Sequence, residues 1–304
     1  MLYARATGGF ALTALSALET LLNGLPEATA GSERGRVALL AQMVARLSGN
    51  PDKAEQHARA MQRIDGADPS DRDLSAWLHV EQELSLGLMD QVKKEIPARM
   101  KTCSVPCGLA MQLALHATIG NRAEAKTFLA QFTALTSDGE RSTATSPQPP
   151  TERRSLALLI EWCNLIYLEA SLELDPQPAF VDTLRSRLGR LRRYDEIHTR
   201  TLAAIATGEL FRLVTQGAGG SVRACKRSCG ELRAHAVIMP RYAAAERVLQ
   251  ATIEALTTPT TGHEALSIAA TDLSKLPYRL DEARYSMLAM RVLLACLLYT
   301  SRCV

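Results

Sequence analysis

A glycine followed five residues later by a small apolar residue recurs in the first half of the chain. It occurs as Gly49 with Ala54, as Gly87 with Val92 and as Gly120 with Ala125. The successive glycines are 38 and 33 residues apart. A glycine ends a helix by adopting the left-handed conformation, and a small residue in the next helix permits close packing against the first. A repeat of this length therefore predicts stacked helical hairpins, none of which buries its apolar face alone.

Composition agrees with a helical fold. Apolar residues make up 47% of the chain, mostly as Ala and Leu, whereas aromatic residues make up 5%. Ala and Leu favour helices, and the residues that strands prefer are scarce. The 35 basic and 32 acidic residues give a net charge of +3. Nucleic-acid-binding domains usually carry a clear basic excess, so nucleic acid is not the expected partner.

The stretch Ala117–Ala125, followed by Phe128, Leu129 and Phe132, resembles the centre of a tetratricopeptide repeat. The stretch Arg46–Ala54 is the second-best match. The Trp/Leu/Gly/Tyr pattern of the first repeat helix is mostly absent. The resemblance implies a fold, namely an all-α solenoid of antiparallel helical hairpins, and no particular site. Concave surfaces of such solenoids commonly bind extended peptides or other proteins.

The segment 137–152 is rich in Ser, Thr and Pro and has no apolar period. Such a segment is typical of a linker or a disordered loop. We therefore expect two lobes: N-terminal repeats over residues 1–136 and C-terminal repeats over residues 153–295, joined by this linker.

The end of the second lobe resembles the closing helices of large bacterial signalling regulators, over Ala243–Leu256, His263–Leu273 and Arg279–Ala295. In those proteins a kinase, cyclase or ATPase domain precedes a helical-repeat region. The resemblance implies that this chain is a C-terminal fragment, and that any catalytic part of the parent protein lies upstream.

The last nine residues, Cys296–Val304, resemble the translation of a transposase adapter used in sequencing libraries. We interpret residues 296–304 as a cloning or assembly scar, which is not expected to contribute to the fold. Five cysteines then remain, which is too few for a disulfide framework. No signal peptide or membrane span is evident, so a cytoplasmic location is expected.

Two cysteine pairs have helical spacing. Cys225 and Cys229 are four residues apart and share a helix face, with His235 nearby in sequence. Structural zinc requires four ligands, and no second pair follows at a suitable spacing. Cys103 and Cys107 have the same spacing but lie in a loop-like stretch more than a hundred residues away. We expect free, partly buried thiols, and no metal or other cofactor; Cys225 and Cys229 are the remaining metal-ligand candidates.

The densest basic run consists of Arg185, Arg187, Arg190, Arg192 and Arg193. It is expected on a helix and is a candidate interaction surface for nucleic acid or an acidic peptide, although acidic residues beside it favour a solvated helix face with local ion pairs. Trp77 and Trp162 lie among leucines and are expected in the core. No sequence motif for a nucleophile, a phosphate-binding loop or a catalytic metal is complete, so no catalytic residue is predicted.

These observations predict a protein-interaction or regulatory helical-repeat region without chemistry of its own. A protein or peptide partner is expected, and a membrane is not. Two alternatives stay open: a self-contained scaffold, and an α-helical enzyme lobe or zinc-stabilised domain that uses the cysteine pairs.

Overall fold

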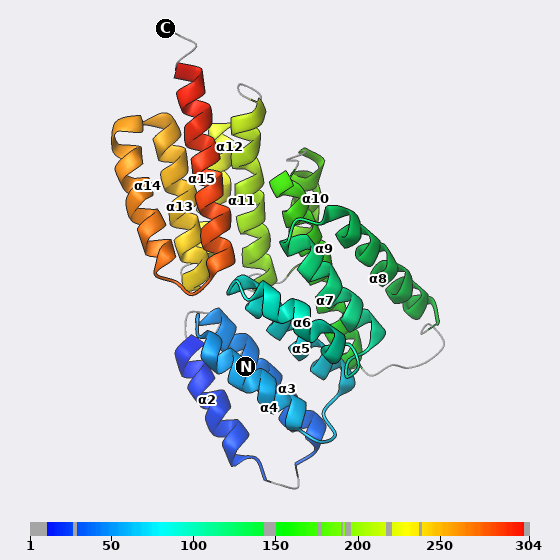
Figure 1. The fold of residues 1–304 in the computed structure, drawn as a ribbon. Coiled ribbons are helices and arrows are strands. Elements are labelled where there is room, and N and C mark those ends of the chain that lie inside the picture. The colour runs from blue at the N-terminus through cyan, green and yellow to red at the C-terminus, as the bar shows by residue number, and fades with distance from the viewer. Residues whose placement is uncertain are drawn as a thin grey trace. The chain divides into compact units, whose positions relative to one another are not determined.

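A computed structural model shows that the chain is helical (Figure 1). It describes residues 11–26, 29–142, 150–174, 178–189, 191, 196–216, 221–236 and 239–300. Every regular element within these ranges is an α-helix. The prediction of an all-α fold is confirmed.

The chain divides into two compact units. Unit 1 comprises Met1–Leu84 and Leu88–Ala170, and unit 2 comprises Ser85–Gly87 and Ser171–Val304. This division differs from the lobes expected on either side of residues 137–152. One helix ends at Ser142 and the next begins at Pro150, so helices extend into the expected linker from both sides. Proline suits a first helical position because the amide hydrogen it lacks would be unpaired there.

Unit 1 contains the helices from α2 to α8 and most of α9. Their bounds are α2 (Ala11–Gly24), α3 (Gly31–Leu47), α4 (Pro51–Arg63), α5 (Pro69–Ser85), α6 (Met89–Arg99), α7 (Val105–Thr118), α8 (Arg122–Ser142) and α9 (Pro150–Leu174). Helices consecutive in sequence pack against each other, as α3 does with α4 and α7 with α8. Residues 143–149 of the expected linker lie outside the described ranges.

The three recurrent glycines share one turn geometry. Gly49, Gly87 and Gly120 have φ values of 72°, 84° and 79°. In each turn the next amide donates to the carbonyl five residues back: Asn50 N to Ala45 O, Leu88 N to Glu83 O and Asn121 N to His116 O, each at 2.9 Å. This is the Schellman helix end, which a left-handed residue makes possible. The small residues that follow, Ala54, Val92 and Ala125, are 0% exposed.

Alternate helices of unit 1 are joined by hydrogen bonds between residues just over thirty positions apart. Gln42 Nε2 on α3 donates to the Ser75 carbonyl on α5 at 3.1 Å, across 33 positions. Cys107 Sγ on α7 donates to the Asp73 carbonyl on α5 at 3.3 Å, across 34 positions. The separations are close to the interval between the glycine turns. Helix α5 therefore lies beside α3 and beside α7 in this unit.

The core of unit 1 contains both tryptophans. Trp77 and Trp162 are 0% and 3% exposed, and their ring centroids are 5.3 Å apart. The prediction that both belong to the core is confirmed. A buried ion pair between Arg46 on α3 and Glu81 on α5 lies within the same unit.

Unit 2 contains the end of α9 and six further helices. Their bounds are α10 (Pro178–Leu188), α11 (Glu196–Gln216), α12 (Val222–Ala236), α13 (Pro240–Thr257), α14 (Pro259–Ser274) and α15 (Arg279–Thr300). Helices α11, α13 and α15 contact one another. Arg241 on α13 forms a buried ion pair with Asp281 on α15.

One described helix, α9, is long and apolar enough to cross a membrane. Its apolar window is Ser155–Leu172, with a mean hydropathy of 1.3. Within the protein, 56% of that window is buried, as is usual for the core helix of a globular protein. Length and composition alone do not distinguish these two roles.

Candidate functional site

A pocket of about 300 Å³ opens on unit 1 beside helices α4, α5 and α6. Its floor includes two small side chains, Ala58 and Ala76, which leave room between the helices. The residues that line it are Ala58, Arg59, Gln62, Arg63, Ala76, His79, Arg99 and Thr102. Three of these eight lining residues are arginines, and none of the eight is acidic.

Carboxylates hold two of these arginines in place. Arg99 donates to both oxygens of Glu83 at 2.7 and 2.9 Å, and it also bonds Glu95. Arg59 pairs with Glu55 one helical turn away. Arg63 is exposed and has no ion pair with any described residue. The pocket therefore has a cationic lining in which two of the three guanidinium groups are anchored.

His79 contributes a neutral polar group to the same pocket. Burial lowers its pKa, although Glu83 counteracts this effect. The distance from His79 Nε2 to Glu83 Oε1 is 3.5 Å. At neutral pH the imidazole is uncharged, so the positive charge of the lining comes from the arginines.

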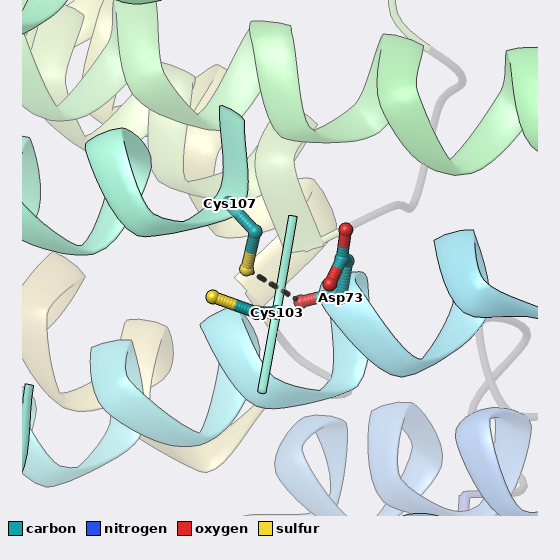
Figure 2. A group of neighbouring side chains, drawn as sticks. All are labelled: Asp73, Cys103 and Cys107. Atoms are coloured by element: carbon teal, nitrogen blue, oxygen red, sulfur yellow. Dashed lines mark hydrogen bonds between the residues drawn. The ribbon is translucent and has the colours of Figure 1, made fainter. Parts of the chain in front are cut away.

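A cluster formed by Asp73, Cys103 and Cys107 lies next to the pocket along the chain. Cys103 follows the lining residue Thr102, and Asp73 precedes the lining residue Ala76 by one turn of α5. One ligand atom from each member of the cluster lies within 4.8 Å of the other two. Figure 2 shows the two sulfur atoms close together, with Asp73 on the neighbouring helix.

The start of α7 positions the cluster. Ser104 caps this helix, and its Oγ accepts the Cys107 amide hydrogen at 3.3 Å. The Ser104 amide donates to Asp73 Oδ1 at 3.2 Å. The Cys107 thiol donates to the Asp73 carbonyl, as shown by the dashed line in Figure 2. The cap and Asp73 together hold the two thiols on the same side of the turn.

The two thiols differ in acidity. The neighbouring Cys107 side chain lowers the pKa of Cys103. The neighbouring Cys103 side chain, together with burial, raises the pKa of Cys107. Burial raises the pKa of the Asp73 carboxyl, and hydrogen bonds from Ser104 partly offset this effect. Cys103 is therefore the first thiol of the pair to ionise, and it is only half-buried.

Cys225 and Cys229, the metal-ligand candidates suggested by spacing, lie in the core of unit 2. They are 0% and 1% exposed on α12. Burial raises the pKa of Cys225 to about 11 and that of Cys229 to about 12. Among described residues, neither belongs to a cluster of three possible metal ligands. The His235 ring lies 4.9 Å from the His198 ring, measured between centroids.

All five cysteines before the C-terminal segment are free thiols, and all but Cys103 are buried. The expectation of free, partly buried cysteines is confirmed. Asp73 was not among the candidate ligands from sequence. Its link to Cys107 was detectable in principle, because their separation of 34 positions matches the repeat interval.

The arginine run is divided by the end of a helix. The first two arginines of the run lie on α10, which ends at Leu188 and is followed by Gly189. Arg185 Nη2 donates to Glu209 Oε1 at 3.1 Å and to Ser228 Oγ at 3.0 Å. Arg185 therefore links α10 to α11 and α12. Arg187 is half-buried on α10, while Arg190, Arg192 and Arg193 lie outside the described ranges.

No protein-family model, curated protein or solved structure matches the chain.

Proposed function

We propose that the chain is a protein-interaction module made of helical repeats, and that the pocket of unit 1 accepts an acidic peptide segment. The observation that carries the proposal is the lining itself, with three arginines and no carboxylate. We further propose that the module is a regulatory region of a larger bacterial signalling protein.

The arginines suit a carboxylate ligand. A guanidinium group can donate two parallel hydrogen bonds to a carboxylate, and such charge-assisted bonds are among the stronger ones in proteins. Arg99 is held by two hydrogen bonds to Glu83 in a part-buried pair, so little of its side-chain freedom remains to be lost on binding. Arg63 brings a cation without a described counterion.

The other polar groups suit a peptide backbone. Gln62 lines the pocket with an amide that can donate and accept hydrogen bonds. Thr102 adds a hydroxyl oxygen that can accept one, since its proton is donated to the Arg99 carbonyl. The regular stacking of α3, α5 and α7 supports the repeat architecture. Repeat architectures commonly present an extended surface to linear segments of other proteins.

Selection from a library of random peptides tests this proposal. Peptides selected on the wild-type chain are expected to be enriched in Asp and Glu. Binding of the selected peptides should weaken at least about tenfold for Arg63→Glu, because the substitution removes a cation and adds a like charge. It should also weaken as salt concentration rises, since the site is open to solvent.

Arg227→Glu is the matched control, because Arg227 is an exposed arginine on α12 of unit 2. It makes the same change in net charge away from the pocket. Equal loss of binding in Arg63→Glu and Arg227→Glu would show that net charge and not the pocket attracts the peptides. Selection of peptides without acidic residues would also contradict the proposal.

A further inference from the structure

We propose that Asp73, Cys103 and Cys107 form a zinc-binding site. The site is independent of peptide binding, and it joins α5 to the segment that enters α7. It does not include the cysteine pair of α12.

The ligand positions fit a tetrahedral ion after a small adjustment. Zinc binds sulfur at about 2.3 Å and carboxylate oxygen at about 2.0–2.2 Å, which places neighbouring ligand atoms roughly 3.5–3.8 Å apart. The three ligand atoms already lie within 4.8 Å of one another. The ligand atoms therefore need to approach one another by about an ångström to surround the ion.

The donor set favours zinc over other common cations. Mg²⁺ and Ca²⁺ prefer oxygen ligands throughout, whereas two sulfurs and one oxygen suit the borderline-soft Zn²⁺ ion. Half-exposed Cys103 leaves a route for water to the fourth coordination position. Three protein ligands and one water form a common zinc arrangement.

The surroundings of the ligands support their orientation. Asp73 Oδ1 accepts the Ser104 amide hydrogen, and such bonds to a ligating carboxylate fix its direction. The serine cap fixes the Cys107 backbone. Cys103 lies one residue before the cap, so it reaches the site from outside the helix.

Zinc binding releases two protons, and the charge of the complex follows from its ligands. The Cys103 and Cys107 thiols each release one proton to solvent as their sulfurs bind the ion. The Cys107 proton leaves its hydrogen bond with the Asp73 carbonyl. Two thiolates, one carboxylate and Zn²⁺ then carry a net charge of −1. No oxidant or reductant is involved.

Metal titration of the reduced full-length chain tests the proposal. Every protein in the titration, including the reference chain, carries Cys296→Ser and Cys303→Ser. The thiols of the C-terminal segment then cannot bind the metal. We expect one Zn²⁺ per chain by elemental analysis and, with Co²⁺ as the probe, a thiolate-to-metal absorption band.

Cys103→Ser and Cys107→Ser should each weaken metal binding and diminish the Co²⁺ band, and the double variant should abolish both. Asp73→Asn should weaken Zn²⁺ binding at least about tenfold.

The Cys225→Ala/Cys229→Ala double variant is the control, because it removes a pair with the same spacing. It should retain one Zn²⁺ per chain. Because both residues are buried and this variant could unfold, alkylation of the unsubstituted pairs provides a second measurement. Added Zn²⁺ should protect Cys103 and Cys107 from alkylation in the folded protein and leave the labelling of Cys225 and Cys229 unchanged.

Three results would overturn the proposal. The first is the absence of bound Zn²⁺ in the fully reduced protein. The second is an unchanged Co²⁺ band after removal of both Cys103 and Cys107. The third is Zn²⁺ protection of the α12 pair in place of the Asp73 cluster. Loss of peptide binding with Zn²⁺ binding intact would affect only the proposed interaction function.

Discussion

The two cysteine pairs have the same spacing but differ in the environment of their first cysteine, because Cys103 is half-buried and Cys225 is buried. Cys103 and Cys107 in unit 1, like Cys225 and Cys229 in unit 2, are four residues apart and lie near the start of a helix at which a serine side chain accepts a backbone amide hydrogen. Among the residues that the structure describes, the first pair forms a group of three possible metal ligands with Asp73, and the second pair belongs to no such group. The second pair is buried, and burial raises both of its pKa values.

The position of the cap explains the difference. In α7, Ser104 lies between the two cysteines, so Cys103 precedes the helix and only Cys107 belongs to it. In α12, Ser221 precedes both cysteines and accepts the Ala224 amide hydrogen at 3.2 Å. Both cysteines then follow the helical period into the core. Two cysteines four residues apart therefore share a helix face only when both follow the start of the helix.

Alkylation rates give the largest predicted contrast between the pairs. The thiolate is the reactive species, and the pKa of Cys103 is lowered while that of Cys229 is raised to about 12. At about pH 7.5 Cys103 should react with iodoacetamide at least about a thousandfold faster than Cys229 in the folded protein. Quantitative mass spectrometry of labelled peptides over time measures both rates in one sample.

The labelling experiment contains its own control. In denaturant both cysteines are exposed, and the two rates should become similar. The Cys103 rate should also rise at a lower pH than that of an ordinary thiol, since a lowered pKa moves ionisation in that direction. Comparable rates for Cys103 and Cys229 in the folded protein would contradict the environments described above.

Stability gives the second contrast. Cys229→Asn introduces a larger polar side chain at a site that is 1% exposed, and should lower the free energy of unfolding by about 2–4 kcal/mol. Cys103→Asn changes a half-buried residue outside the helix and should alter it by no more than about 0.5 kcal/mol. Urea denaturation of both variants, followed by circular dichroism, measures the difference. Equal destabilisation would show that Cys103 is as well packed as Cys229.

The helices and their turns were the part of the structure best predicted from sequence. Glycine φ values, capping bonds and buried small residues depend on local sequence, and the Gly49 and Gly120 turns contain them as expected. The boundary between the two units was harder to predict from the sequence. A polar composition over residues 137–152 does not prevent helix formation at its edges, and the division inside α9 depends on contacts distant in sequence.

The candidate site was predictable only in part, because it depends on two levels of structure. The Ser104 cap and Pro106 indicate a helix start between the cysteines, and this information is local. The approach of Asp73 requires the alignment of α5 with α7, which only the repeat interval suggests. The grouping of Arg59, Arg63 and Arg99 in one pocket likewise depends on how three helices pack.

Removal of the two serine caps is expected to change stability least. It also tests most directly whether the position of the cap separates the two cysteine pairs. Ser104→Ala and Ser221→Ala each remove a side-chain acceptor from the first turn of a helix, which typically costs about 1 kcal/mol. Hydrogen exchange should show a comparable loss of protection at the start of α7 and of α12, because the local change is the same. Only Ser104→Ala should also change the alkylation rate of a cysteine, since Ser104 alone lies between two thiols and its hydroxyl oxygen accepts the amide hydrogen of one of them, Cys107. If Ser221→Ala altered the reactivity of Cys225 as much as Ser104→Ala altered that of Cys103, the cap position would not be what separates the two pairs.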